Sequence, residues 1–169
     1  RVYDAKRSLD VSKITIPQLL FPDGTPVDTA VAKIVITKAL MDTKDAGLAK
    51  STTIEYEISN TNFTFVGGAT AGSYTAMTVD NAKRLAILTP AEPAFPAEKV
   101  YDCSVDFNMR AEQVIDNVQA DEAGNLDHLS LAVTSSALDD PNVGMRNATY
   151  SVELAGADKH NYYLAQDTW

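Results

Sequence analysis

The chain of 169 residues carries 14 basic and 23 acidic residues, which gives a net charge of −9, and 45% of its residues are hydrophobic. This composition is that of a globular protein with one ordinary domain or two small ones, and it argues against a disordered or collagen-like chain. The acidity disfavours nucleic-acid binding, and no apolar run approaches the roughly 20 residues of a membrane-spanning helix. Because the chain begins at Arg1 without Met or a secretory leader, we interpret it as processed or as part of a longer protein.

The first half of the chain reads as short strands separated by turns. Residues Lys33–Thr37 are rich in β-branched side chains, and Thr53–Ile58 alternates apolar with polar residues. Asn62–Val66 alternates in the same way and is also predicted to be a strand. Turn signals lie between these segments, at Pro22–Gly24 and at Gly67–Gly68.

A proline-rich segment, residues 89–98, divides the chain. Its three prolines, Pro90, Pro93 and Pro96, favour an extended connection and exclude a helix. The charge changes across it, since residues 1–88 hold ten basic and nine acidic residues, whereas residues 99–169 hold four basic and twelve acidic ones. We therefore predict two domains, 1–88 and 99–169, joined by a linker over 89–98.

The second half also reads mainly as strand. Leu129–Thr134 and Thr149–Leu154 are predicted strands, with turns at Gly124-Asn125 and Gly156. One segment, Arg110–Val118, could instead be a short helix, because its apolar residues fall on one helical face. The pattern as a whole predicts an all-β protein of two small Ig-like β-sandwich modules, the alternative being a β-grasp-like module with that one helix.

Three pairs of landmarks suggest that the two halves are repeats. Both halves open with a basic residue followed by Val-Tyr-Asp, at Arg1–Asp4 and again at Lys99–Asp102. The second pair aligns Met41–Gly47 with Leu138–Gly144, and the third aligns Ala71–Thr75 with Lys159–Tyr163.

The sequence offers little catalytic chemistry, and we predict neither an enzyme nor a cofactor. It contains no G-x-S-x-G elbow and no phosphate-binding glycine motif, and its single cysteine, Cys103, excludes an internal disulfide. The best metal candidate is the oxygen-rich set of Asp121, Asn125 and Asp127, although an acidic hairpin tip explains it more simply. A Lys–Asn isopeptide cross-link is a further alternative, but no lysine stands out as its partner.

Aromatic side chains could form a platform for a sugar ring. Tyr163 and Trp169 are the residues predicted for such a site. Tyr162, Tyr3 and Tyr101 are instead expected to pack into the β core, where Tyr3 and Tyr101 would anchor the first strand of their own modules. On that expectation, Tyr101→Ala would lower the melting temperature of the second module more than that of the first.

The repeated motifs resemble those of the YDG repeats of bacterial surface adhesins. Lys99–Ser104 is similar to the family's opening Lys-Val-Tyr-Asp-Gly-Thr, Leu138–Gly144 to its central motif, and Val152–Leu164 to its closing motif. The first half matches less well, because its closing motif is not recognisable and it has extra residues around Pro22–Pro26. Alanine and cysteine, at Ala5 and Cys103, replace the family's glycine, a residue favoured where φ is positive.

The resemblance implies tandem extracellular β modules in a protein attached to a bacterial cell surface. Such modules act mostly as stalks that present distal binding domains, with the neighbouring repeats as partners. The alternative is a module that binds a carbohydrate or a host or matrix protein. The motif residues that the resemblance carries over are Tyr3, Asp4, Gly47, Tyr74, Tyr101, Asp102, Gly144, Gly156, Asp158, Asn161 and Tyr162.

Overall fold

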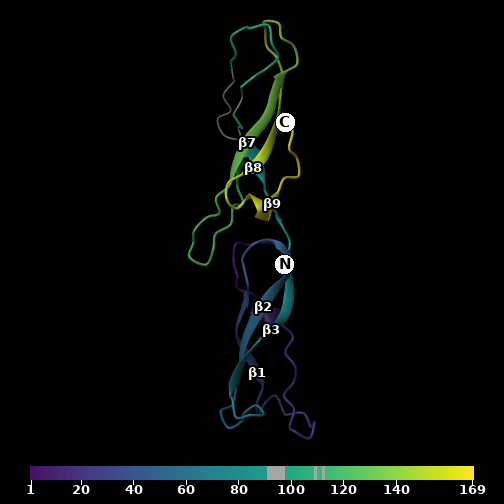
Figure 1. Ribbon diagram of the computed structural model, residues 1–169, viewed down its shortest axis with the longest axis vertical. Coiled ribbons are helices and arrows are strands. Elements are labelled where there is room, and N and C mark those ends of the chain that lie inside the picture. Colours follow the sequence, from purple (N-terminus) through teal and green to yellow (C-terminus); the bar gives the residue numbers. More distant parts are fainter. Residues whose placement is uncertain (91–97, 109, 112) are drawn as a thin grey trace. The chain divides into compact units, whose positions relative to one another are not determined.

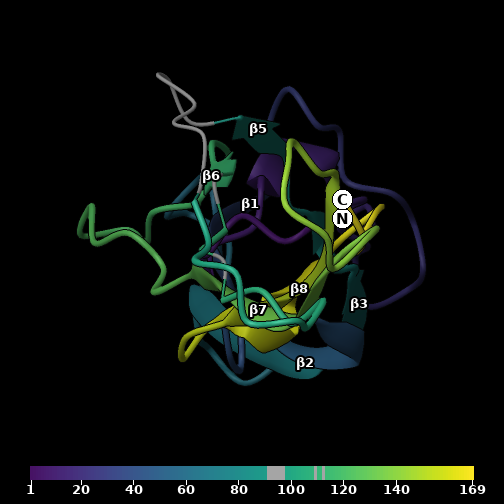
Figure 2. The same cartoon turned by 90° about the horizontal axis from the view of Figure 1, so that it is seen from above.

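The computed structural model describes residues 1–90, 98–108, 110–111 and 113–169, and it is all-β (Figures 1 and 2). Contacts divide the chain into two compact units. Unit one consists of Arg1 and Lys6–Asn81, and unit two consists of Val2–Ala5 and Ala82–Trp169. Four residues from the start of the chain thus belong to the body formed by its C-terminal half. Across the residues that are described, no helix is long and apolar enough to cross a membrane.

Unit one is built on an antiparallel sheet in the order β1-β2-β3 (Figure 1). The strands are β1 (Ile34–Met41), β2 (Gly47–Ile58) and β3 (Ala71–Asn81), and a 3-10 turn, η1 (Val11–Lys13), precedes them. The predicted strands at 33–37 and 53–58 lie in β1 and β2.

The core of unit one lies beside this sheet. Val27, Ala32 and Ile58 are buried together, and Leu19, Phe63 and Phe65 pack against them. The prediction of a strand over residues 62–66 is wrong, because the chain turns there so that both phenylalanines reach this core. Burial of the two rings outweighs the local preference for an extended strand.

Unit two contains several short sheets. The antiparallel pair β7 (Ser130–Leu138) and β8 (Ala148–Ala155) is the longest, and its strands lie side by side in both views (Figures 1 and 2). A second antiparallel pair joins β5 (Leu88–Pro90) to β6 (Gln113–Ile115). The third pair is parallel and joins β4 (Arg84–Leu85) to β9 (Tyr162–Tyr163), which follows the 3-10 turn η2 (Lys159–Asn161).

The helix that residues 110–118 could form is not present, so that alternative is wrong. Gln113–Ile115 is strand β6, and a turn follows at residues 116–117, while residues 109 and 112 lie outside the described part. Pairing with β5 supplies the backbone hydrogen bonds here, and the Asn117 side-chain amide donates to the Leu85 carbonyl at 2.6 Å. The apolar pattern of a segment this short fits a helix and a strand equally well, and the partner strand decides between them.

The β1–β2 and β7–β8 hairpins share details beyond their strands. Each carries one bulge, between Ile36 and Lys38 in the first and between Val133 and Ser135 in the second. The threonine at each bulge, Thr37 or Thr134, donates its hydroxyl to a carbonyl of the opposite strand, at 3.2 and 3.3 Å.

The loops that precede the two hairpins also match. Gly24 and Gly124 both have a φ of 85° and close the same turn, with Phe21 N donating to Thr25 O and Asp121 N to Asn125 O. The second half thus builds the same turn from a sequence without the prolines of Pro22–Pro26.

The third landmark pair, by contrast, does not correspond in space. Tyr74 lies on β3 opposite Ile54, whereas Tyr162 lies in β9 beside Arg84. Through the equivalence of β2 and β8, Tyr74 corresponds instead to Trp169, whose backbone exchanges two hydrogen bonds of 2.8 Å with Tyr150. The alignment of Tyr74 with Tyr162 is thus wrong.

The contact boundary between the two units falls between Asn81 and Ala82. Residues 91–97 of the predicted linker lie outside the described part of the chain, and Pro90 is the last residue of β5.

Candidate functional site

The most distinctive site of unit two is a buried cluster of two tyrosines and a carboxylate. The Tyr3 hydroxyl donates to Asp127 Oδ2 at 2.9 Å, and the Tyr162 hydroxyl donates to the same oxygen at 2.7 Å. The two rings meet edge to face with their centroids 5.5 Å apart. All three side chains are buried, so we call Tyr3, Asp127 and Tyr162 the tyrosine clamp.

Backbone contacts hold Tyr3 in this clamp. Tyr3 N donates to the Ala82 carbonyl at 2.8 Å, and Val2 forms a parallel bridge with Ala82. The Arg84 guanidinium donates from Nε to the Tyr3 carbonyl, also at 2.8 Å. The segment Val2–Ala5 is therefore fixed to the residues that lead into β4.

Gln119 holds the other two clamp residues, Tyr162 and Asp127, in place through its backbone. Gln119 N donates to the Tyr162 hydroxyl oxygen at 2.9 Å, so this hydroxyl accepts one hydrogen bond while donating another to Asp127. Asp127 follows the Asp121–Asn125 turn, and its N donates to the Gln119 carbonyl. Since charge-assisted hydrogen bonds are stronger than neutral ones, a carboxylate with two hydroxyl donors is a stable way to bury a charge.

Burial raises the pKa of the Tyr3 and Tyr162 hydroxyls well above 10, and the hydrogen bond to Asp127 raises each pKa further. Ionising either hydroxyl would place a second negative charge in a buried site and remove a donor from the carboxylate. The clamp is therefore a structural device that depends on both tyrosines remaining neutral.

These raised pKa values predict that unit two loses stability in alkali. Unfolded tyrosines ionise near pH 10 while the clamped ones stay protonated, so the clamp contribution is complete below about pH 10 and falls as the pH rises above it. We expect the urea midpoint of unit two, followed by Trp169 fluorescence, to fall more steeply between pH 10 and 11 in the wild type than in a Tyr3→Phe, Tyr162→Phe double variant. Equal slopes would contradict neutral, buried hydroxyls.

The closing motif positions Tyr162 through a close approach of two backbone segments. Gly156 has a φ of 102°, and a Cβ added there would lie 2.1 Å from the His128 carbonyl oxygen. Asp158 Oδ2 accepts a hydrogen bond of 2.8 Å from His128 N, next to Asp127 in the chain. The buried Asn161 then leads from η2 into Tyr162.

The tyrosine of the second opening segment is exposed, unlike that of the first. Tyr3 is 0% exposed and Tyr162 is 2% exposed, which agrees with their expected packing in a core, but Tyr101 is 55% exposed. The expectation that Tyr3 anchors the module that it opens is wrong, because Tyr3 packs in unit two. The expectation that Tyr101 packs into the second module is wrong, because Tyr3 occupies the clamp of unit two. Asp102 is exposed beside it, and its Oδ1 accepts from Ser104 N at 2.9 Å.

The three candidate metal ligands have different hydrogen-bond partners. Asp121 Oδ1 accepts from Ala123 N and Asn125 N, each at 2.9 Å, and the Asn125 amide donates to Asp121 Oδ2 at 3.0 Å. Asp127 instead accepts from the two tyrosines of the clamp. Among the described residues, no group of three or more His, Cys, Asp or Glu side chains could hold a metal ion.

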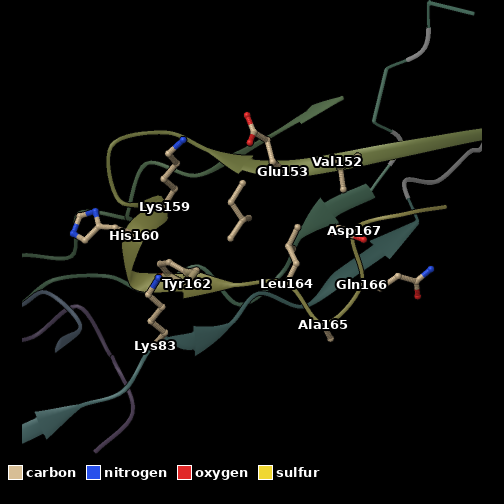
Figure 3. Close-up of a pocket in the computed structure, with 11 residues that line it drawn as sticks. Lys83, Val152, Glu153, Lys159, His160, Tyr162, Leu164, Ala165, Gln166 and Asp167 are labelled. Carbon is tan, nitrogen blue, oxygen red and sulfur yellow. The ribbon is translucent and has the colours of Figure 1, made fainter. Parts of the chain in front are cut away.

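An open hollow of about 510 Å³ lies beside β8 and the residues that follow η2 (Figure 3). Val152 and Leu164 point into it, whereas the Glu153 carboxylate points away, as alternation along a strand requires. Tyr162 lines the hollow, but the two aromatic residues predicted to bind a ligand do not. Tyr163 is exposed in β9, and Trp169 is 37% exposed beside Tyr150.

The remaining motif residues have separate positions. Asp4 is half-buried next to Tyr3, Gly47 begins β2, and Tyr74 is exposed on β3. Gly144 lies in the loop between β7 and β8 with a φ of 139°.

Sequence reasoning missed the role of Asp127 and the destination of Val2–Ala5. The matching hydrogen bonds of the two loops make Val27 of unit one equivalent to Asp127 of unit two. Because the residue type differs between the two halves, no repeated motif marks Asp127 in the sequence. The repeated Val-Tyr-Asp was visible, but the 124 residues between Tyr3 and Asp127 left no local signal of their contact.

Comparison with known proteins supports the division of the chain. The model of the YDG domain matches residues 83–169, which is a little over half of the chain and nearly the whole C-terminal part of unit two. No curated protein and no solved structure matches the chain. By the match of its C-terminal half, the chain belongs to the YDG domain family.

Proposed function

We propose that this chain is part of the stalk of a bacterial surface protein, in which two tandem YDG-type β-sandwich modules space distal binding domains from the cell. Its place would be extracellular, and its neighbours would be further repeats of the same chain. The repeated bulges, threonine hydrogen bonds and glycine turns of the two hairpins support the tandem arrangement. The acidic surface would keep an extended array soluble.

The observation that carries a mechanical role is the tyrosine clamp. It joins Val2–Ala5 to a body that begins only at Ala82, so it closes a loop of chain that contains Lys6–Asn81. A force entering at Arg1 reaches Val2–Ala5 first, and while the clamp holds it passes directly into residues 82–169. The rest of unit one would then be spared the load.

The clamp is suited to this task because several bonds must break together. Tyr3 is held by its hydroxyl, its backbone N and its carbonyl, each with a different partner in unit two. The neighbouring pairs Val2–Ala82 and β4–β9 are parallel, and a pull along the strands loads all their hydrogen bonds at once.

The test is single-molecule stretching of the chain with handles at both ends. We expect the step that releases residues 6–81, roughly 250 Å of extended chain, to occur at clearly lower force in Tyr3→Ala than in the wild type. Tyr74→Ala is the matched control, because Tyr74 is an exposed tyrosine on β3, and it should leave that force unchanged. Equal forces in all three chains would show that the clamp does not resist the applied force.

One observation favours the binding alternative. Tyr74 and Trp169 occupy equivalent positions opposite β2 and β8, and both are exposed, at 54% and 37%. Exposed flat rings can stack on sugar faces, so the ligand in this alternative is a glycan. A glycan screen would support it through a reproducible hit that free ligand blocks and that Trp169→Ala removes, whereas no binding would leave the stalk as the better proposal.

A further inference from the structure

The second opening segment, Val100–Cys103, shares one unusual backbone angle with the first. Ala5 has a φ of 61° and Cys103 a φ of 64°, although neither is glycine and such values are uncommon for other residues. Both segments contain Val-Tyr-Asp immediately before this residue. The two segments therefore share a sequence and an unusual backbone angle.

The chain that follows each opening segment runs along the equivalent hairpin. The Arg7 carbonyl accepts from Met41 N at 2.9 Å, and the Val105 carbonyl accepts from Leu138 N at 2.8 Å. Two isolated antiparallel bridges continue this match, Ser8 with Leu40 and Asp106 with Ala137. Each opening segment thus precedes its own hairpin in the same way.

The surroundings of the two segments differ. The first is inserted into unit two, where Tyr3 and Ala5 are fully buried. The second presents its apolar residues to solvent, with Val100 89% exposed and Tyr101 55% exposed. Val2 of the first segment is also exposed, at 54%, so the difference lies in Tyr101 and Cys103, which are exposed where Tyr3 and Ala5 are buried. An exposed tyrosine whose counterpart is buried indicates a surface that a partner covers.

The second segment is already ordered without that partner. Lys99 Nζ lies 2.8 Å from Asp102 Oδ1 and donates to the Ser104 carbonyl, and Ser104 N donates to the same Asp102 oxygen. The hydrogen bond from Lys99 is the main reason, and those from Ser104 are further reasons, that the pKa of Asp102 is lowered to about 2. The Asp102 carboxylate is therefore charged at physiological pH and keeps its contact with Lys99. An ordered turn pays less conformational entropy on binding than a flexible one.

We propose that Lys99–Cys103 docks onto a further YDG unit at the place where Val2–Ala5 docks onto Ala82–Trp169. We call this place, which is formed by Ala82, Arg84, Asp127 and Tyr162, the clamp groove. Tyr101 would donate to the carboxylate that corresponds to Asp127, and Val100 would pair in parallel with the strand segment that corresponds to Ala82. Each unit is then completed by the opening segment of another repeat, which interlocks the array. This docking rests on the tandem arrangement proposed above and names the partner of the second opening segment.

The experiment uses the chain without its first five residues, so that it starts at Lys6 and its clamp groove is empty. Synthetic peptides of residues 1–6 and 99–104 are titrated into it, and binding is read from the thermal midpoint of unit two and from Trp169 fluorescence. We expect both peptides to raise the midpoint, and the 99–104 peptide with Tyr101→Ala to bind at least about tenfold more weakly. The intact chain, whose groove holds Val2–Ala5, should not respond to the peptides.

The shortened chain will fold poorly if the groove must be filled, and the same titration then measures recovery of the native Trp169 signal. Recovery with both peptides, lost in the Tyr101→Ala peptide, supports the docking. Recovery or binding with the 1–6 peptide alone, or with neither peptide, overturns it. This result is separate from the stretching experiment, because a clamp that carries load through Tyr3 can exist whether or not Tyr101 docks elsewhere.

Discussion

Tyr3→Ala should destabilise unit two by about 3–5 kcal/mol and leave unit one nearly unchanged, although Tyr3 is only the third residue of the chain. The substitution removes a fully buried ring, its edge-to-face contact with Tyr162 and one of the two hydroxyl donors to Asp127. A buried carboxylate with a donor removed adds to the loss of apolar burial.

Two probes separate the units in this measurement. Trp169 is the single tryptophan and belongs to unit two, so its fluorescence follows that unit during urea unfolding. Amide exchange at Asp42 and Ile58, whose N–H groups are hydrogen-bonded within unit one, reports the other unit. Tyr101→Ala is the control, and because Tyr101 is largely exposed we expect a change within about 0.5 kcal/mol. If Tyr101→Ala destabilised unit two more than Tyr3→Ala does, Tyr101 and not Tyr3 would be the tyrosine that completes the core of unit two.

Local patterns predicted the four strands of the two hairpins, whereas β3 and the short strands β4, β5, β6 and β9 were not predicted. The β-branched run at 33–37 and the alternating runs at 53–58, 129–134 and 149–154 fall on the long strands of the two hairpins, with only Lys33 and Leu129 lying one residue before their strands. They were readable because each strand has one buried face, which imposes a period of two on the sequence. The predictions of a strand at 62–66 and of a possible helix at 110–118 failed, because a short apolar pattern does not specify which part of the chain buries it.

The clamp was beyond such reasoning for a different reason. The sequence indicated that Tyr3 and Tyr162 pack in a core, but a local pattern could not indicate that they share one core or that both bond Asp127. That Tyr3 belongs to unit two depends on a parallel pairing with Ala82, and parallel pairing needs a long connection that carries no turn signal. The exposed state of Tyr101 follows from the same pairing, since one groove accepts one opening segment.

Alignment of the two halves by short landmarks had a similar limit. Tyr74 was aligned with Tyr162 on a shared tyrosine, whereas strand register equates Tyr74 with Trp169. Hydrogen-bond partners identify equivalent positions even where the residue type changes, as with Val27 and Asp127. Residue identity alone cannot do this in repeats that have diverged.

Gly156→Ala is expected to be the most damaging single change in the closing motif, with a loss of at least about 4 kcal/mol from the stability of unit two. Its φ of 102° is unfavourable for alanine, and the new Cβ would lie 2.1 Å from the His128 oxygen and 2.8 Å from the His128 carbonyl carbon. Both are backbone atoms that cannot rotate away. The segment after Gly156 must therefore move, and it carries Asp158, η2 and Tyr162.

Gly124→Ala separates the two causes of this loss. Gly124 also has a positive φ, 85°, but nothing lies within 4 Å of a Cβ added there, so this change should cost only about 1 kcal/mol. Urea unfolding followed by Trp169 fluorescence measures both variants. If the two substitutions cost the same, the close approach of Gly156 to His128 contributes nothing. If Gly156→Ala costs far more and also flattens the alkaline fall in stability, the closing motif positions Tyr162 in the clamp, because displaced tyrosines regain the pKa they have in solvent.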